Sequence, residues 1–146
     1  MDLLAVRLTP VAGWECRHVE VQASIRPVSY LTKLPKDVAK ESGRARGSAK
    51  QRTEAELRAA VREWIRTKYD HPVKKKTLLK LAPGPWSREL VVHEVKFPEE
   101  VDIIGESGLT VRRLADVLHE LKRKTLLDGA AGSNLTDLVA LSTGAE

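Results

Sequence analysis

The chain has 146 residues, with 25 Lys and Arg against 20 Asp and Glu, so its net charge is +5 and its isoelectric point is about 9.5. This length fits one domain over residues 1–146, and no apolar run approaches the roughly 20 residues of a membrane span. The single cysteine, Cys16, excludes an internal disulfide, and the first residues lack the pattern of a signal peptide. We therefore expect a cytoplasmic protein whose basic balance permits a nucleic-acid partner without requiring one.

The first 25 residues predict two strands joined by a turn. Residues 2–8 form the first strand and residues 15–25 the second, with Thr9, Pro10 and Gly13 among the residues that turn the chain between them. The second strand alternates, as a half-buried strand does. Its apolar side carries Val19, Val21, Ala23 and Ile25, and its polar side carries His18, Glu20, Gln22 and Ser24.

Residues 35–52 are rich in basic and small residues, and we expect a mobile loop there, because such a segment buries little apolar surface. One interpretation is an arm that follows a phosphate backbone. The other is a solvated loop with no partner, since a basic run alone is a weak signal. The candidate nucleic-acid contacts are Arg44, Arg46, Lys50 and Arg52, together with the later run Lys74, Lys75 and Lys76.

A helix is clearly indicated from Thr53 onward. Thr53 and Glu56 have the spacing of a capping box, and apolar residues recur at helical intervals after them. The expected core positions are Leu57, Ala60, Val61, Trp64 and Ile65. The helix should end near Tyr69, because Pro72 disfavours helical geometry in the residue before it.

The second half of the chain predicts shorter elements. They are a strand over residues 78–81, a strand over 89–97, a helical turn over 98–104, a brief strand over 109–111, a helix over 113–124 and a short helix over 133–142. The order predicts an α/β (α+β) fold in which two main helices flank a mixed central sheet of about four to five strands.

Two carboxylates near the amino end suggest a metal site. Asp2 heads the first strand and Glu20 lies near the end of the second, so a hairpin can bring them together. Two facing carboxylates suit a hard divalent cation. Gln22 lies two residues beyond Glu20 and points to the same side.

This arrangement resembles the restriction-endonuclease-like (PD-(D/E)XK) nucleases, in which an aspartate opens one strand and Glu-x-Lys or Asp-x-Lys follows on the next. The resemblance implies that Asp2 and Glu20 hold Mg²⁺ or Mn²⁺ at a scissile phosphate, with Gln22 as the third catalytic residue. Gln22 stands where lysine is usual and brings no positive charge. The family's first helix and strand do not precede Asp2, so the resemblance implies an incomplete core: a fragment of a longer protein, a core whose missing pieces come from elsewhere, or a degenerate member.

A second Glu-x-Lys pair occurs at Glu94 and Lys96, with Asp70 or Glu89 as its upstream acid. Asp70 does not head a strand. In the competing interpretation, Glu94 and Lys96 are an ordinary pair of charges on the solvent side of a strand.

Two functions therefore stand side by side. The first is a metal-dependent endonuclease domain that hydrolyses DNA phosphodiesters through Asp2, Glu20 and Gln22. The second is a non-catalytic module that binds nucleic acid, DNA or RNA, or another protein. Either could act as a homo-oligomer or within a larger assembly, and neither involves a membrane.

Overall fold

The computed structural model describes residues 2–10, 13–24 and 26–127, so the predicted helix over 133–142 lies outside the described residues. The elements in chain order are β1 (Asp2–Thr9), β2 (Gly13–Gln22), α1 (Lys36–Glu41), α2 (Glu54–Lys68), α3 (Pro72–Leu81), β3 (Trp86–Val92), α4 (Glu99–Glu106), β4 (Thr110–Arg113) and α5 (Leu114–Leu127). By its contacts the chain divides into two compact units, Met1–Val111 and Arg112–Glu146. The single domain expected for the whole chain stays a prediction.

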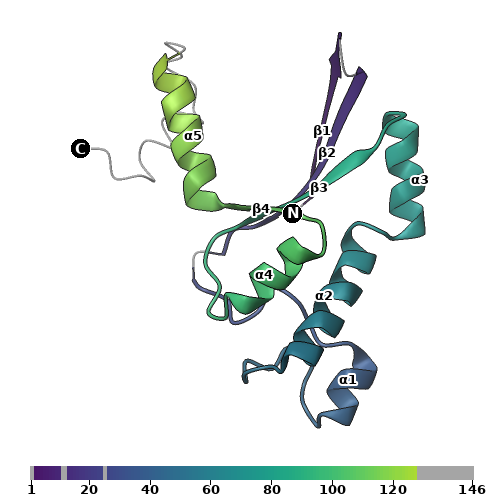
Figure 1. Cartoon of the computed structure of the whole chain (residues 1–146), viewed down its shortest axis with the longest axis vertical. Helices are drawn as coiled ribbons and strands as arrows, with labels where there is room; N and C mark the ends of the chain where they lie inside the picture. The colour runs from purple at the N-terminus through teal and green to yellow at the C-terminus, as the bar shows by residue number, and fades with distance from the viewer. Residues whose placement is uncertain (1, 11–12, 25, 128–146) are drawn as a thin grey trace. The chain divides into compact units, whose positions relative to one another are not determined.

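The four described strands form one mixed sheet in the order β1-β2-β3-β4 (Figure 1). β1 and β2 are antiparallel, whereas β2 and β3 are parallel and are joined by a crossover that contains α1, α2 and α3. The predicted combination of helices with a mixed sheet is confirmed.

The predicted amino-terminal hairpin is confirmed, with Gly13 at its turn. Gly13 has a φ of 70°, a conformation that glycine adopts without a steric penalty. The register pairs Thr9 with Gly13 and places Asp2 opposite Glu20. The spacing of the turn thus fixes which residues of the two strands are neighbours.

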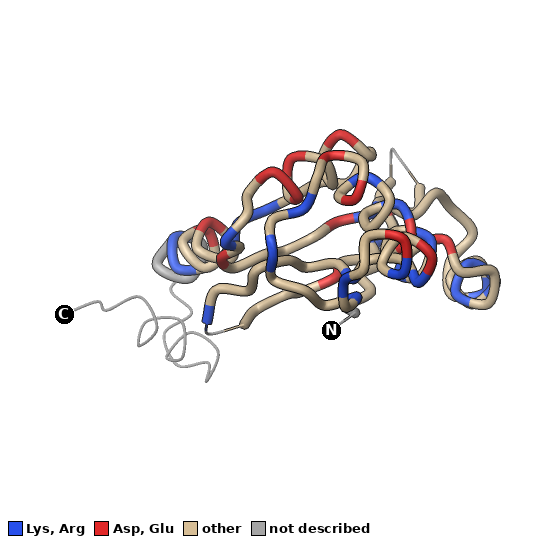
Figure 2. Tube along the Cα trace, turned by 90° about the horizontal axis from the view of Figure 1, so that it is seen from below, with Lys and Arg blue, Asp and Glu red and all other residues tan. Residues whose placement is uncertain are grey.

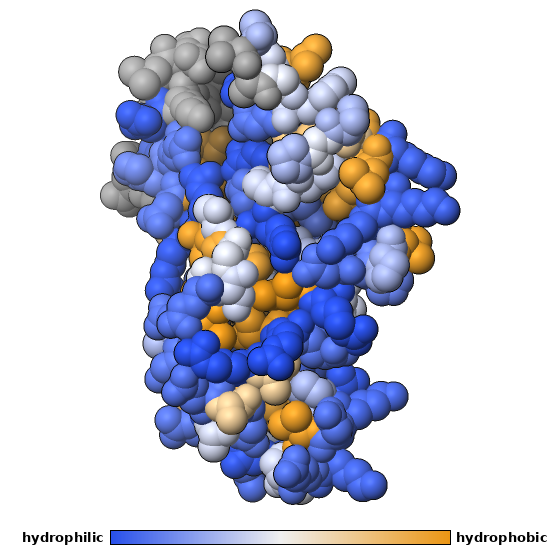
Figure 3. All heavy atoms as spheres, turned by 45° about the vertical axis from the view of Figure 1, so that its right-hand side comes forward, coloured by the Kyte–Doolittle hydropathy of each residue, from blue (hydrophilic) through white to orange (hydrophobic). Residues whose placement is uncertain are grey.

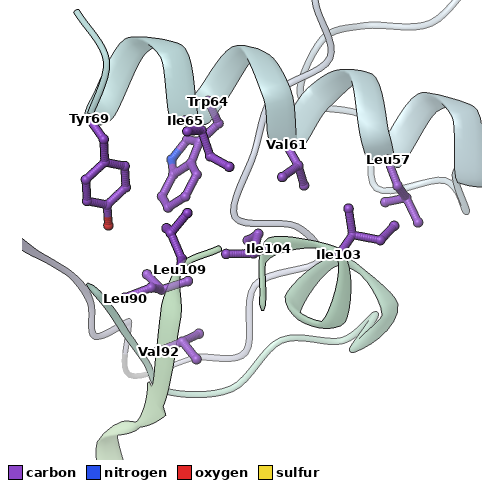
Figure 4. Packing of buried hydrophobic residues seen from close by; sticks show 10 residues of the cluster. All are labelled: Leu57, Val61, Trp64, Ile65, Tyr69, Leu90, Val92, Ile103, Ile104 and Leu109. Atoms are coloured by element: carbon purple, nitrogen blue, oxygen red, sulfur yellow. The ribbon is translucent and has the colours of Figure 1, made fainter. Parts of the chain in front are cut away.

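Helix α2 begins as the capping box predicts. The Thr53 hydroxyl accepts from the Glu56 backbone N–H, and the Glu56 carboxylate accepts from the Thr53 N–H. The buried side of α2 packs on β3 and α4. Figure 4 shows the apolar side chains of α2 pointing toward Leu90, Val92 and Ile104. The core positions expected on this helix are all buried: Leu57, Ala60, Val61, Trp64 and Ile65.

Residues 78–81 were predicted to form a strand, and that prediction is wrong. They belong to α3, which begins with Pro72 at its first turn, where proline's missing N–H has no intrahelical acceptor to lose. The Lys and Leu residues that fill this segment are good helix formers. The strand predicted over 89–97 is displaced as well, because β3 ends at Val92.

Residues 35–52 are not structureless. They include α1, and Leu34 and Ala39 are buried against Ala60 of α2. Two backbone hydrogen bonds, from Leu34 N–H to the Arg46 carbonyl and from Arg44 N–H to the Ala39 carbonyl, hold the segment to itself.

Two later predictions are confirmed. The helical turn expected over 98–104 is α4, and the helix expected over 113–124 is α5. Within the second unit, Arg112 forms an ion pair with Glu120 of α5.

Candidate functional site

The polar side of β2 is the side that faces α2. Cys16, His18 and Glu20 are buried, whereas Val19 and Val21 of the opposite side are only half-buried. The rings of His18 and Tyr69, the residue that ends α2, lie 4.7 Å apart. The carboxyl end of α2 is therefore packed over the candidate catalytic strand.

Glu20 is fully buried and is held by two other groups. Its Oε1 lies 2.7 Å from the Lys68 Nζ and accepts a hydrogen bond of 2.7 Å from the Gln22 Nε2. The Lys68 side chain is 33% exposed, whereas that of Glu20 is 0% exposed. Helix α2 thus brings a cation to the place where the strand itself carries glutamine.

The backbone register places Asp2 opposite Glu20, as the sequence predicted. The side chain of Asp2 lies outside the described part of the structure. Among the described side chains, no group of three or more His, Cys, Asp and Glu could hold a metal ion. Mg²⁺ needs fewer, because it binds through one or two carboxylates together with water and substrate phosphates. The donor types at positions 2 and 20 fit that smaller requirement.

A pocket of about 250 Å³ opens beside this cluster, and we call it the Gln22 pocket. It is lined by Gln22, Leu31, Lys33, Arg46, Glu63, Trp64, Thr67 and Lys68. Three of these side chains are cationic. The one anion, Glu63, accepts hydrogen bonds from both Nε and Nη2 of Arg66, and the bond from Arg66 lowers the pKa of its carboxyl.

The predicted nucleic-acid contacts of the basic segment differ in their surroundings. Arg44 donates to the Gln51 carbonyl and to the Glu56 carboxylate. Arg46 is exposed and its Nε donates to the Leu34 carbonyl at 2.7 Å. Lys50 is exposed. Two of these arginines therefore stabilise the segment internally, which a basic composition does not reveal.

Arg52 is not on the surface at all. Its side chain is 1% exposed, its Nη1 lies 3.6 Å from the fully buried Glu100 carboxylate, and its guanidinium stacks over the Tyr30 ring. Both Nη groups donate to Thr32, whose N–H donates in turn to Glu100. Burial lowers the pKa of Arg52 and raises that of the Glu100 carboxyl, against the hydrogen bonds from Leu31 and Thr32. This is a structural contact between the 30–34 loop, the segment just before α2, and α4.

The three consecutive lysines lie on α3. The Lys74 Nζ donates to the Lys68 carbonyl at the end of α2, and the Lys75 Nζ pairs with Asp70 at 2.8 Å. Lys76 is exposed. None of the three lines the Gln22 pocket.

The rival Glu-x-Lys pair lies beyond the end of β3. Glu94 and Lys96 are exposed and flank Val95, which makes an isolated bridge with Val28. Of the proposed upstream acids, Asp70 pairs with Lys75 and Arg88, and Glu89 forms a bidentate pair with Arg17. Both candidate upstream acids are therefore paired with cations other than Lys96 in the described part of the structure.

Charged residues of both signs occur throughout the trace (Figure 2). Part of the positive charge is matched by ion pairs within one helix, as in Arg58–Glu54 and Arg66–Glu63. Apolar side chains also reach the surface among hydrophilic ones (Figure 3), and Leu3, Leu4, Val6, Leu8 and Trp14 of the hairpin are all more than 40% exposed.

The sequence matches no protein-family model, no curated protein and no solved structure. No helix within the described residues has the length and apolar character needed to cross a membrane.

Proposed function

We propose that the chain is a metal-dependent nuclease domain that cleaves DNA phosphodiesters at the cluster formed by Asp2, Glu20, Gln22 and Lys68. The observation that carries the proposal is the Glu20 cluster itself: a buried carboxylate, an amide two residues on, and a lysine from another element that lines a basic pocket. Glu20 and Gln22 lie near the carboxyl end of β2, which runs parallel to β3.

Each residue has a distinct role in this proposal. Asp2 and Glu20 would hold the Mg²⁺ or Mn²⁺ ion, which supplies a Lewis acid at the scissile phosphate when it is bound. Gln22 orients the attacking water through its amide. Lys68 supplies the positive charge that Gln22 lacks, and it can interact with phosphate because a third of its side chain is exposed. The resemblance to restriction-endonuclease-like nucleases is part of this proposal.

One observation favours a second candidate, a module that binds nucleic acid without cleaving it. Lys68 and Gln22 already satisfy Glu20 Oε1, so the buried charge has a counterion without any metal. In this candidate Glu20 holds α2 against β2, and the cations of the Gln22 pocket contact phosphate. Nicking activity distinguishes the two candidates.

The test is conversion of supercoiled plasmid to its nicked form by the purified chain with Mg²⁺ or Mn²⁺, and with EDTA as the metal-free control. We expect metal-dependent nicking that Glu20→Ala abolishes while the circular dichroism spectrum stays unchanged. Nicking that persists in the folded Glu20→Ala variant would show that Glu20 is not catalytic. Binding without nicking under every metal condition would favour the second candidate.

A further inference from the structure

The lining of the Gln22 pocket holds three cations and one anion. Lys68 is paired with Glu20, and the other two cations have no ion-pair partner among the described residues. Lys33, Arg46 and Lys68 line it together with Glu63, and Glu63 is already paired with Arg66 on the surface of α2. Grouping like charges around one concavity is unfavourable unless an anion occupies it. The pocket is thus suited to an anionic ligand.

Arg46 is held in place but keeps part of its hydrogen-bonding capacity. Its Nε donates to the Leu34 carbonyl, and its own carbonyl accepts from the Leu34 N–H at 2.9 Å. Among the described residues neither Nη of Arg46 has a hydrogen-bond partner. A guanidinium fixed in this way can offer two donors to one phosphate.

Lys33 is the second available cation. It is exposed, and within the described residues its Nζ has no hydrogen-bond or ion-pair partner. Its backbone is well fixed, because the flanking residues Thr32 and Leu34 are both buried. An exposed lysine on an anchored loop can reach a phosphate without reordering the backbone.

Building on the proposed function, we propose that the Gln22 pocket is a subsite for a backbone phosphate of the nucleic-acid strand, bound by Lys33 and Arg46 next to the phosphate that is cleaved at Glu20. Lys68 lies between the two positions, because it contacts Glu20 and also lines the pocket. The half-buried Leu31 and the Trp64 side chain supply apolar contact for the adjoining sugar. The substrate class is a continuous polynucleotide strand.

The test is the salt dependence of binding to a fluorescent DNA duplex, measured by anisotropy in EDTA so that no cleavage occurs. Each phosphate contact contributes about 0.9 to the slope of log K against log salt concentration. We expect Lys33→Ala to make the slope shallower by about 0.9 and to weaken binding several-fold at low salt. Lys36→Ala is the matched control, because Lys36 is also exposed but does not line the pocket, and its slope should not change.

Arg46→Gln is the second variant, with its melting temperature measured because the Leu34 contact is lost. It should reduce the slope as Lys33→Ala does, and the double variant should reduce it further. Equal salt slopes for wild type, Lys33→Ala and Arg46→Gln would overturn the subsite. The absence of DNA binding would overturn it too, as would a Lys36→Ala slope that falls as much as that of Lys33→Ala. The nicking assay separately decides the proposed function, so binding that depends on Lys33 but gives no nicking would keep the subsite and remove catalysis.

Discussion

Two of the buried glutamates that face cations, Glu100 and Glu20, lie in regions that differ in how their partners are exposed. Around Glu100 both partners are inaccessible: the Arg52 side chain is 1% exposed, and the N–H groups of Leu31 and Thr32 also donate to the carboxylate. Around Glu20 the carboxylate is equally buried, but Lys68 is 33% exposed and a pocket adjoins it. We call the first the closed cluster and the second the open cluster.

Under the proposed function, this difference separates a structural buried charge, Glu100, from a functional one, Glu20. The closed cluster ties the 30–34 loop to α4 and to the segment just before α2. A pocket of about 340 Å³ that Tyr30 and Arg52 help to line adjoins it, but its two charged side chains are only 1% and 0% exposed and so are not accessible to a ligand. An open cluster can exchange one of its partners for a ligand, because the cation can turn to solvent or to a phosphate. Helix α2 joins the two, with Arg52 just before its amino end and Lys68 at its carboxyl end.

The largest expected effect is on stability at the closed cluster. Glu100→Ala leaves the Arg52 charge buried without its counterion and removes the acceptor of the Leu31 and Thr32 N–H groups, so the free energy of unfolding should fall by about 3–5 kcal/mol. Glu20→Ala should cost less, about 1–3 kcal/mol, because Lys68 can reach water. Urea unfolding of both variants measures this. A larger fall in the free energy of unfolding for Glu20→Ala than for Glu100→Ala would contradict the assignment of Glu100 as the structural charge.

The next effect concerns the cation of the open cluster. Lys68→Gln keeps a hydrogen-bond donor near Glu20 but removes the charge, so nicking should slow by about 10- to 100-fold. Lys68→Arg should retain more activity. Lys80→Gln, an exposed lysine near the end of α3, is the control and should leave the nicking rate unchanged. Equal rates for Lys68→Gln and Lys80→Gln would remove Lys68 from the mechanism.

A smaller effect is expected in the pH dependence of the free energy of unfolding, at Glu56 in the capping box of α2. The backbone N–H of Thr53 and the nearby Arg44 lower the pKa of the Glu56 carboxyl below its ordinary value of 4.5. The native state therefore binds this proton less readily than the unfolded chain, so the stabilisation is present above the ordinary pKa and is lost as pH falls through the lowered one. Glu56→Gln should lose less stability than wild type between about pH 5 and pH 3. The measurement is the free energy of unfolding of both proteins across this pH range. Parallel curves for the two proteins would contradict a lowered pKa of Glu56.

The smallest expected effect is on DNA affinity and concerns the charges that line the Gln22 pocket. Glu63→Gln removes the one anion of its lining, so DNA binding should tighten by about twofold at low salt and by less at high salt, where screening weakens the repulsion. Glu54→Gln, at an exposed glutamate of the same helix outside the pocket, is the control. Tighter binding by both variants to the same degree would indicate a general charge effect.

Local signals in the sequence predict part of this structure well. The capping box of Thr53 and Glu56 and the helical spacing of Leu57, Val61 and Ile65 fix α2, because both act between near neighbours. The hairpin register that places Asp2 opposite Glu20 likewise follows from a short turn. In the segment rich in Lys and Leu before residue 82, where a strand was predicted, helix propensity prevailed and α3 formed.

The site itself depends on contacts that no local pattern encodes. Lys68 meets Glu20 from 48 positions away, and only the packing of α2 over β2 brings them together. Arg52 belongs to a run of basic residues that reads as exposed, yet Glu100 and Tyr30 bury it. The polar side of β2, which carries Glu20, is buried for the same reason: α2 packs on that side of the strand. The packing of the helix, and not the polarity of the strand residues, decides which side of β2 is buried.

The most direct test of the open cluster is a matched pair of isosteric substitutions on one sheet, Glu20→Gln and Glu89→Gln. Glu89 is also buried and paired with a cation, Arg17, which is 40% exposed, but it does not line the Gln22 pocket. Plasmid nicking with Mg²⁺, measured for both folded variants, should be abolished by Glu20→Gln and retained by Glu89→Gln. Loss of nicking in both variants, or in neither, would contradict the assignment of Glu20 as the catalytic carboxylate.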